Sequence, residues 1–200
     1  MAQSIIKTSI ELLIIGGSAG SLEVILKAFP KLDKELPFAI IIVLHRKPNT
    51  DSTLIDLLSA KTKIPVIEAN EKEPIKKGHI YVAPADYHLL IENDRTLSLD
   101  YSEKVNFSRP CIDITFQTAA ETYQNTLACL LLSGASTDGV EGLELVKALS
   151  GITAVQDPQT AEVPYMPQKA LEKIKVDFVV ETGKVGDFVN SLAGSAANRK

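Results

Sequence analysis

The sequence predicts a three-layer α/β fold with a doubly wound, mainly parallel sheet and an antiparallel extension. Apolar runs of strand length occur at residues 11–16, 38–44, 127–132 and 152–156. These runs are continuous rather than alternating, which indicates strands that are covered on both faces. Segments with helical spacing lie between them, and a chain in which strands and helices alternate is expected to form a parallel sheet with helices on both sides.

The predicted helices are recognised by apolar residues three and four positions apart. Three such sets follow or precede the strands: Leu22, Ile25, Leu26 and Phe29; Leu54, Leu57 and Leu58; and Val140, Leu143, Val146 and Leu149. Two further helices are expected over residues 112–124 and 165–174, and the second of these should be interrupted near Pro167, because proline lacks the amide hydrogen that a helix interior uses.

Residues 64–101 break the alternation of strand and helix. This segment holds four short strand-like pieces, IPVIEA, HIYVAP, HLLIEN and TLSLDY, which are separated by turn signals such as Lys-Gly and Asn-Asp-Arg. Short strands joined by turns are typical of antiparallel pairs. We therefore place the antiparallel extension here.

The composition indicates one domain over residues 1–200, with an ordered core from about residue 10 to residue 192. A chain of 200 residues with 45% hydrophobic and 23% charged residues can bury a substantial core without disulfides or a structural metal. The tail, SLAGSAANRK, is small and polar, so we expect it to fray.

Charge and cysteine usage exclude several classes of function. A net charge of -4 and scattered basic residues argue against nucleic-acid binding, which needs clustered Lys and Arg. Cys111 and Cys129 have no CxxC or CxxH spacing, so we expect buried or half-buried thiols and no zinc site. No apolar run approaches the ~20 residues that cross a bilayer, and we expect a cytoplasmic protein without membrane insertion.

Three chemically capable side chains follow predicted strands, where ligands bind in open α/β sheets. Ser18 sits in the glycine-rich turn GGSAGS, His45 follows FAIIIVL, and Asp138 lies in SGASTDG after LACLLL. A hydroxyl, an imidazole and a carboxylate at one sheet edge are the parts of a Ser-His-Asp arrangement, in which Ser18 is the nucleophile, His45 Nε2 the base and Asp138 the orienting acid. Backbone amides near Ala19 or around Ala135 are the candidate oxyanion donors.

Each of these residues also has a structural explanation. Ser18 is compatible with a turn or helix-cap serine, His45 with a satisfied histidine at a strand end, and Asp138 with a helix N-cap. The turn GGSAGS has neither the GxGxxG spacing nor a following GK[ST], so a phosphate-binding loop is not indicated. His79 is expected in a surface turn, and His88, the rival base, in a structural or rim position.

Six segments together resemble the protein-glutamate methylesterases of bacterial chemotaxis, the CheB family. They are IIGGSAGSLE, IIVLHR, KKGHIYVAPADYHLLI, SRPCIDITF, LLLSGASTDGVEGL and VPYMPQKAL, in this order from about Leu12 to Val180. The resemblance implies the doubly wound fold, hydrolysis of glutamate methyl esters without metal or organic cofactor, and a triad of Ser18, His45 and Asp138. It also leads us to assign the substrate pocket to Gly17, Ser21, Arg46, Tyr165 and Met166.

The resemblance further implies a set of partners and leaves alternatives open. The expected substrates are methylated cytoplasmic helices of a chemoreceptor, with deamidation of receptor glutamines as a second reaction, and a methyltransferase or a separate response regulator is a further candidate partner. We expect a stand-alone catalytic domain without a receiver domain. Ala19 and Ser21 depart from the family pattern, which motivates one alternative, a catalytically weakened regulatory or binding module. The other alternative is a small-ester hydrolase unrelated to chemotaxis.

Overall fold

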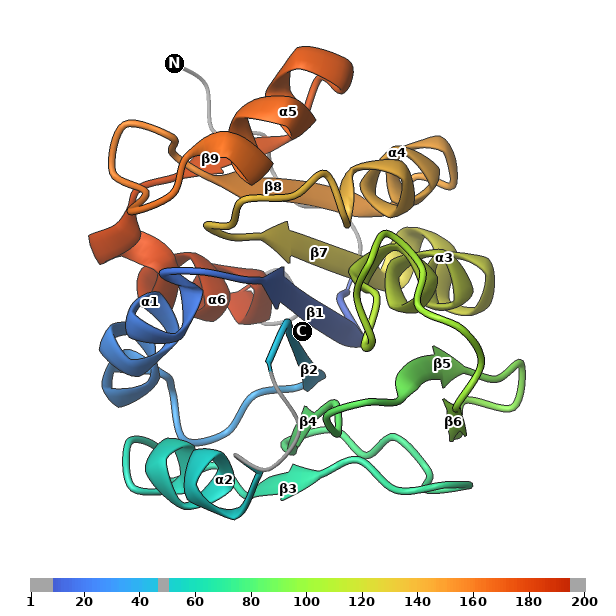
Figure 1. Ribbon diagram of the computed structural model, residues 1–200. Helices are drawn as coiled ribbons and strands as arrows, with labels where there is room; N and C mark the ends of the chain where they lie inside the picture. The colour runs from blue at the N-terminus through green and yellow to red at the C-terminus, as the bar shows by residue number, and fades with distance from the viewer. Residues whose placement is uncertain (1–8, 47–50, 195–200) are drawn as a thin grey trace.

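The central layer of the protein is a parallel sheet, which the computed structural model describes together with the rest of residues 9–46 and 51–194 (Figure 1). In this part of the chain the sheet has seven strands in the order β3-β4-β2-β1-β7-β8-β9, and each neighbouring pair is parallel. The strands are β1 Leu12–Gly17, β2 Ala39–Leu44, β3 Val66–Glu68, β4 Ile80–Val82, β7 Leu127–Leu131, β8 Ile152–Gln156 and β9 Phe178–Val180.

Helices cover both faces of this sheet and enclose two hydrophobic cores. Alternate residues of β1 supply both cores: Leu13 and Ile15 face one, and Leu12 and Ile14 face the other. The first core is closed by α1 Ser21–Ala28, α2 Asp51–Ser59 and α6 Val185–Gly194, and the second by α3 Ile112–Tyr123, α4 Val140–Ala148 and α5 Tyr165–Lys173. Short 3-10 turns lie at η1 Phe29–Lys31, η2 Gln124–Thr126 and η3 Thr182–Lys184. The predicted three-layer α/β fold is confirmed.

The antiparallel extension is smaller than the sequence predicted. Among the strands of the described residues, one pair is antiparallel, β5 His88–Ile91 with β6 Leu97–Asp100, and it lies beneath α3 in Figure 1. The pieces IPVIEA and HIYVAP instead become β3 and β4, which extend the main sheet in parallel, so that part of the prediction is wrong. The reason is burial, because Val66 and Ile80 join the core beneath α2, where parallel extension gives their apolar side chains cover on the helical face.

Three further details differ from expectation. Helix α5 is not interrupted near Pro167, because this proline is the third helical residue, where the backbone amide needs no partner within the helix. Strand β9 and helix α6 were not anticipated. The tail prediction is wrong for Ser191–Gly194, which complete α6 with Leu192 buried, and residues 195–200 lie outside the described part of the chain.

Candidate active site

The ends of β1, β2 and β7 are joined by hydrogen bonds that place Ser18 and His45 side by side. The His45 amide donates to the Gly17 carbonyl (3.1 Å), and the Ser18 amide donates to the Ser133 carbonyl (2.9 Å). Gly20 follows with φ +81°, a conformation that glycine adopts without strain, and helix α1 then begins at Ser21. The glycine-rich turn therefore presents Ser18 at the carboxyl edge of the sheet, as expected for a ligand-binding position.

His45 and Asp138 form a direct hydrogen bond. His45 Nε2 lies 2.7 Å from Asp138 Oδ2, and because an ionised carboxylate can only accept, Nε2 carries the proton of this bond. The other ring nitrogen, Nδ1, lies 3.4 Å from the Ser108 hydroxyl. The structure thus differs from our expectation that Nε2 faces Ser18, since Nε2 is held by the acid and Nδ1 is the nitrogen that remains for proton transfer.

The Asp138 carboxylate is fully buried and surrounded by donors. Besides His45, it accepts from the backbone amides of Ile112 (2.7 Å) and Asp113 (3.0 Å) at the N-terminus of α3, and from Cys111 Sγ (3.0 Å). Burial alone would raise the pKa of Asp138, but the hydrogen bonds from His45, Cys111 and the two amides outweigh it and lower the pKa to about 2. Asp138 is therefore ionised at neutral pH, as an acid that orients a histidine must be.

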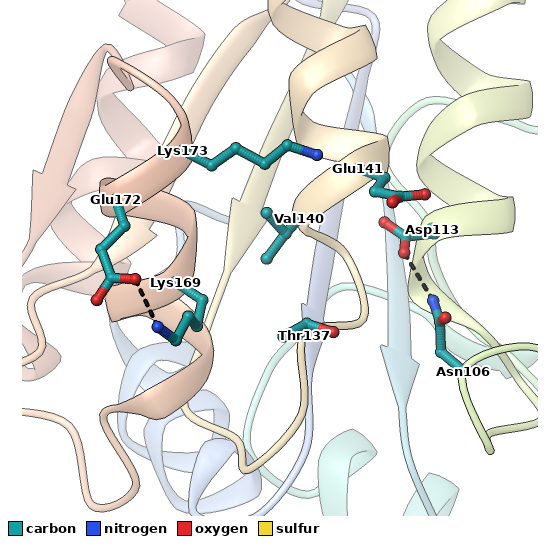
Figure 2. Close-up of a pocket in the computed structure, with 8 residues that line it drawn as sticks. All are labelled: Asn106, Asp113, Thr137, Val140, Glu141, Lys169, Glu172 and Lys173. Carbon is teal, nitrogen blue, oxygen red and sulfur yellow. Dashed lines mark hydrogen bonds and ion pairs between the residues drawn. The ribbon is translucent and has the colours of Figure 1, made fainter.

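A second buried carboxylate, Asp113, lies beside the first. Its Oδ1 accepts from the Gly142 amide (2.6 Å) and its Oδ2 accepts from Asn106 Nδ2 (2.8 Å), a bond drawn in Figure 2. Burial and the charge of Asp138 raise the pKa of Asp113 to about 6 despite the bond from Gly142. Asp113 is therefore the more easily protonated member of the pair.

Cys111, Asp113 and Asp138 are the one group of potential metal ligands that lie close together in the described residues, within 4.8 Å of one another. Burial and the negative charge of Asp138 raise the pKa of the Cys111 thiol, so this side chain stays protonated. The oxygens of both carboxylates accept hydrogen bonds from the protein. The donor set fits a hydrogen-bonded acid pair rather than a metal centre, which needs a deprotonated thiol.

Ser18 opens onto a cavity that it shares with His45. The cavity has a volume of about 310 Å³, and its lining combines these two side chains with Arg46, Thr53 and four leucines, Leu22, Leu44, Leu54 and Leu57. In the described part of the chain no hydrogen bond joins Ser18 to His45, although both side chains face the same space. The lining suits a short apolar group attached to a polar carbonyl.

The candidate oxyanion donors flank Ser18 on two loops. Ala19 and Ala135 are exposed, and among the described residues neither backbone amide has a hydrogen-bond acceptor. Gly134, next to Ala135, lies so close to Ser18 that a Cβ built on it would stand 2.9 Å from Ser18 Cβ. Both amides are therefore unpaired in the described residues and lie on the loops that flank Ser18, and their role as oxyanion donors stays a prediction.

The predicted pocket residues divide into two groups. Arg46 lines the cavity, and its guanidinium is fixed by the Ala83 carbonyl (2.8 Å), while Tyr165 is exposed at the start of α5. Tyr165 does not line the cavity, and Gly17, Ser21 and Met166 are buried away from it, so of the five predicted pocket residues Arg46 alone is among the described residues that line it. The physical role of the buried residues is support: Ser21 Oγ donates to the Ser18 carbonyl (2.5 Å), and Met166 packs against Gly134.

The two other histidines are placed as the sequence indicated. His79 is partly exposed, directly after the turn at Lys77 and Gly78, and its Nδ1 contacts the Lys77 carbonyl. His88 is fully buried, where Nδ1 accepts from the Cys111 amide (3.2 Å) and Nε2 donates to the Glu103 carbonyl (3.0 Å). It is a structural histidine that anchors the loop before α3.

Comparison with known proteins identifies the family of this fold and site. The family model described as CheB methylesterase matches residues 13–189. The chain belongs to the CheB methylesterase family. The structure also matches the crystal structure of the Thermotoga maritima CheB methylesterase catalytic domain with a TM-score of 0.87 at 31% identity, covering 92% of this chain and all of that one.

Curated relatives fall into two length classes. A Leptospira interrogans protein, provisionally named a protein-glutamate methylesterase/protein-glutamine glutaminase, is 42% identical over 178 residues, which is 89% of this chain and 92% of the relative. The Thermotoga maritima protein-glutamate methylesterase/protein-glutamine glutaminase is 32% identical over 91% of this chain, but the match covers 54% of its length. For the Pyrococcus horikoshii protein of the same name the identity is 33%, over 88% of this chain and 48% of the relative. The CheB catalytic region is thus the part that all three share with this chain.

Sequence reasoning missed four residues that touch the His45–Asp138 pair or its neighbour: Asn106, Ser108, Cys111 and Asp113. The segment SRPCIDITF, one of those that carry the family resemblance, contains Ser108, Cys111 and Asp113, but its sequence did not indicate that it contacts the His45–Asp138 pair. A separate question is whether the chain could span a membrane. None of the helices within residues 9–46 and 51–194 combines the length and the apolar character that a membrane span requires.

Proposed function

We propose that this CheB-family chain is a serine hydrolase that removes methyl groups from glutamate methyl esters of chemoreceptor proteins. The observation that carries the proposal is the 2.7 Å hydrogen bond between His45 and the ionised, buried Asp138, on the strand edge where Ser18 faces the same cavity. A nucleophilic serine needs a nearby base, and the base needs a group that orients it.

The proposed reaction proceeds through two acyl-transfer steps. Ser18 Oγ attacks the ester carbonyl while its proton passes to His45 Nδ1, and the amides of Ala19 and Ala135 hold the oxyanion. The tetrahedral intermediate then expels methanol, which takes the proton from His45. Water attacks the glutamyl-serine ester with the same base, which releases the glutamate carboxylate and restores the Ser18 hydroxyl. A glutamine side chain would react in the same way with ammonia as the leaving group.

The substrate class rests on the relatives. Their names assign methylesterase and glutaminase activity to proteins that share this catalytic region, and both activities begin from a glutamyl carbonyl. The cavity beside Ser18 is apolar apart from a few groups and holds about 310 Å³, which suits a methyl ester carried on a protein helix. The proposed partners are therefore the methylated cytoplasmic helices of a chemoreceptor, together with a methyltransferase or response regulator of the same pathway.

Methanol release from a methylated chemoreceptor cytoplasmic fragment tests the proposal. Release should be lost in Ser18→Ala and His45→Ala, and should persist in the control variants Ser59→Ala and His79→Ala, which alter exposed or partly exposed residues outside the cavity. No release by the folded wild-type protein would refute the proposed substrate. Hydrolysis of small soluble methyl esters without receptor hydrolysis would favour a small-ester hydrolase, and the absence of both would favour a regulatory or binding module.

A further inference from the structure

A loop that precedes α3 reaches the catalytic acid through one side chain, Asn106. Its Nδ2 donates to Asp113 Oδ2 (2.8 Å) and lies 3.3 Å from Asp138 Oδ1, so a single amide group bridges two buried carboxylates. Asn106 adopts φ +52° and the next residue, Phe107, φ +60°, which is the left-handed region that asparagine tolerates better than most residues. Figure 2 shows the Asn106 side chain pointing at Asp113 from this loop.

The two carboxylates need such a donor, because like charges that are close and buried repel each other. Asp113 is 4% exposed and Asp138 is fully buried. Within residues 9–46 and 51–194, the other titratable or charged groups that face the pair are His45, Cys111, Glu141 and Lys173. Glu141 adds further negative charge beside Asp113, whereas Lys173, which extends toward Glu141 in Figure 2, is ion-paired with Glu144 (2.9 Å).

The loop has other anchors, so Asn106 is not required merely to hold it in place. Arg109 binds Asp86 (2.8 and 3.1 Å) and the carbonyl of Tyr101 (3.1 Å), and His88 binds the Glu103 carbonyl. These contacts fix both ends of the segment that contains Asn106. The Asn106 amide, in contrast, is directed at the two carboxylates and at Cys111 Sγ, 4.0 Å away.

We propose that Asn106 is a positioning residue for the catalytic acid: its amide bridges Asp113 and Asp138 and thereby keeps Asp138 ionised and aimed at His45. The activity readout rests on the function proposed above. Asn106 lies behind the acid and is not among the residues that line the Ser18 cavity, so its loss should lower kcat and leave KM nearly unchanged. It lines instead a separate cavity of about 340 Å³ with Asp113, Thr137 and Glu141, shown in Figure 2.

The main test is Asn106→Asp, which keeps the side-chain shape and the tolerance for positive φ but replaces the donor with a third carboxylate. We expect kcat to fall about tenfold or more with KM within about twofold, because a charge-assisted hydrogen bond is exchanged for repulsion. The extra negative charge also stabilises the protonated form of the base, so the acid limb of the pH profile should move to higher pH. Asn106→Gly, which keeps the backbone conformation and only removes the donor, should give a smaller change in the same direction.

The control is Lys104→Ala, an exposed residue of the same loop with no side-chain partner among the described residues, which should leave kcat and the pH profile unchanged. Thermal unfolding of each variant shows whether it folds. If Asn106→Asp does not fold, Asn106→Gly takes its place as the test variant. Wild-type kcat and an unmoved acid limb in a folded variant would overturn the proposal. Equal losses in both variants without any shift of the acid limb would also overturn it, since they would indicate a loop anchor only.

A second readout separates this proposal from the proposed substrate. The rate at which a fluorophosphonate labels Ser18 depends on the base and the acid but needs no receptor. If the wild-type protein is labelled and Asn106→Asp moves the acid limb of labelling upward, the positioning role holds even when no methanol is released from a receptor. If the receptor ester is hydrolysed but Asn106→Asp changes neither the rate of labelling nor the rate of hydrolysis, the proposed function stands and the positioning role is refuted.

Discussion

Replacing Asp138 with asparagine tests the site at its most constrained point. The two oxygens of Asp138 accept from five groups: His45 and the Ile112 amide at Oδ2, and Cys111, Asn106 and the Asp113 amide at Oδ1. Asparagine is isosteric but offers one oxygen and one NH2 group. In either orientation its NH2 must face a backbone amide of α3, so at least one buried donor loses its acceptor.

The expected loss of stability in Asp138→Asn follows from the lowered pKa of Asp138. Its pKa of about 2 lies roughly two units below the ordinary value of 3.8, which corresponds to about 2 kcal/mol of stabilisation at neutral pH. Because the folded-state pKa is lowered, this contribution is present above pH 4 and is lost as the pH falls toward 2. One unsatisfied buried amide costs about 1–3 kcal/mol, so Asp138→Asn should lower the free energy of unfolding by about 2–3 kcal/mol.

Catalysis should suffer more than stability. Where a Ser-His-Asp triad is established, the same substitution lowers kcat by about 10⁴ because the histidine adopts the wrong tautomer. We expect at least about 10³ here, since Nε2 would lose the acceptor that holds its proton. Urea unfolding and methanol release measure the two effects, with the exposed Asp187→Asn on α6 as control. A folded Asp138→Asn protein that keeps more than about a tenth of the wild-type rate would refute the assignment of Asp138 as the orienting acid.

Two further predictions concern neighbouring residues. Ser21→Ala removes the hydroxyl that donates to the Ser18 carbonyl, so the free energy of unfolding should fall by about 1 kcal/mol while KM stays unchanged. Thermal unfolding and steady-state kinetics measure the two quantities. A changed KM at unchanged stability would instead assign Ser21 to the substrate pocket. The pKa of Asp113 is raised to about 6, so its contribution to stability is present below pH 4 and lost as the pH rises through 6. Asp113→Asn should abolish this pH-dependent loss of stability, which is worth up to about 3 kcal/mol. Urea unfolding of the wild-type protein and of Asp113→Asn at pH 4.5 and pH 7 measures it. The same pH dependence in both proteins would contradict the raised pKa of Asp113.

The parts of the fold that are local were predictable, and those set by tertiary packing were not. The apolar runs that became β1, β2, β7 and β8 are continuous, and such a pattern leaves few alternatives to a buried parallel strand. The strands β3 and β4, which form within the pieces IPVIEA and HIYVAP, are only three residues long, so their direction depends on which neighbouring strand they pair with rather than on their own sequence. Pro167 shows the same limit, because its effect depends on where α5 begins.

The site divides in the same way. Ser18, His45 and Asp138 could be proposed as one site because each follows a strand and the strand ends of a parallel sheet converge. The structure places His45 against Asp138 and beside the cavity of Ser18. Nothing local could reveal that α3 directs its first amides at Asp138 or that Asn106 would reach across to the same carboxylate. Those contacts join residues 25 to 32 positions apart and exist only once α3 packs beside α4.

This arrangement explains why a buried acid can serve the reaction without a large cost to the fold. An unpaired carboxylate in the core would take up a proton, and a protonated Asp138 could not hold the Nε2 proton of His45. The N-terminus of α3 supplies amides that favour an anion, and Cys111 stays a thiol and so remains a donor. The pKa of Asp113 is raised to about 6 while that of Asp138 is lowered to about 2, and Asn106 lies between the two carboxylates. Asp138, the proposed orienting acid, therefore stays ionised across the pH range in which Asp113 titrates.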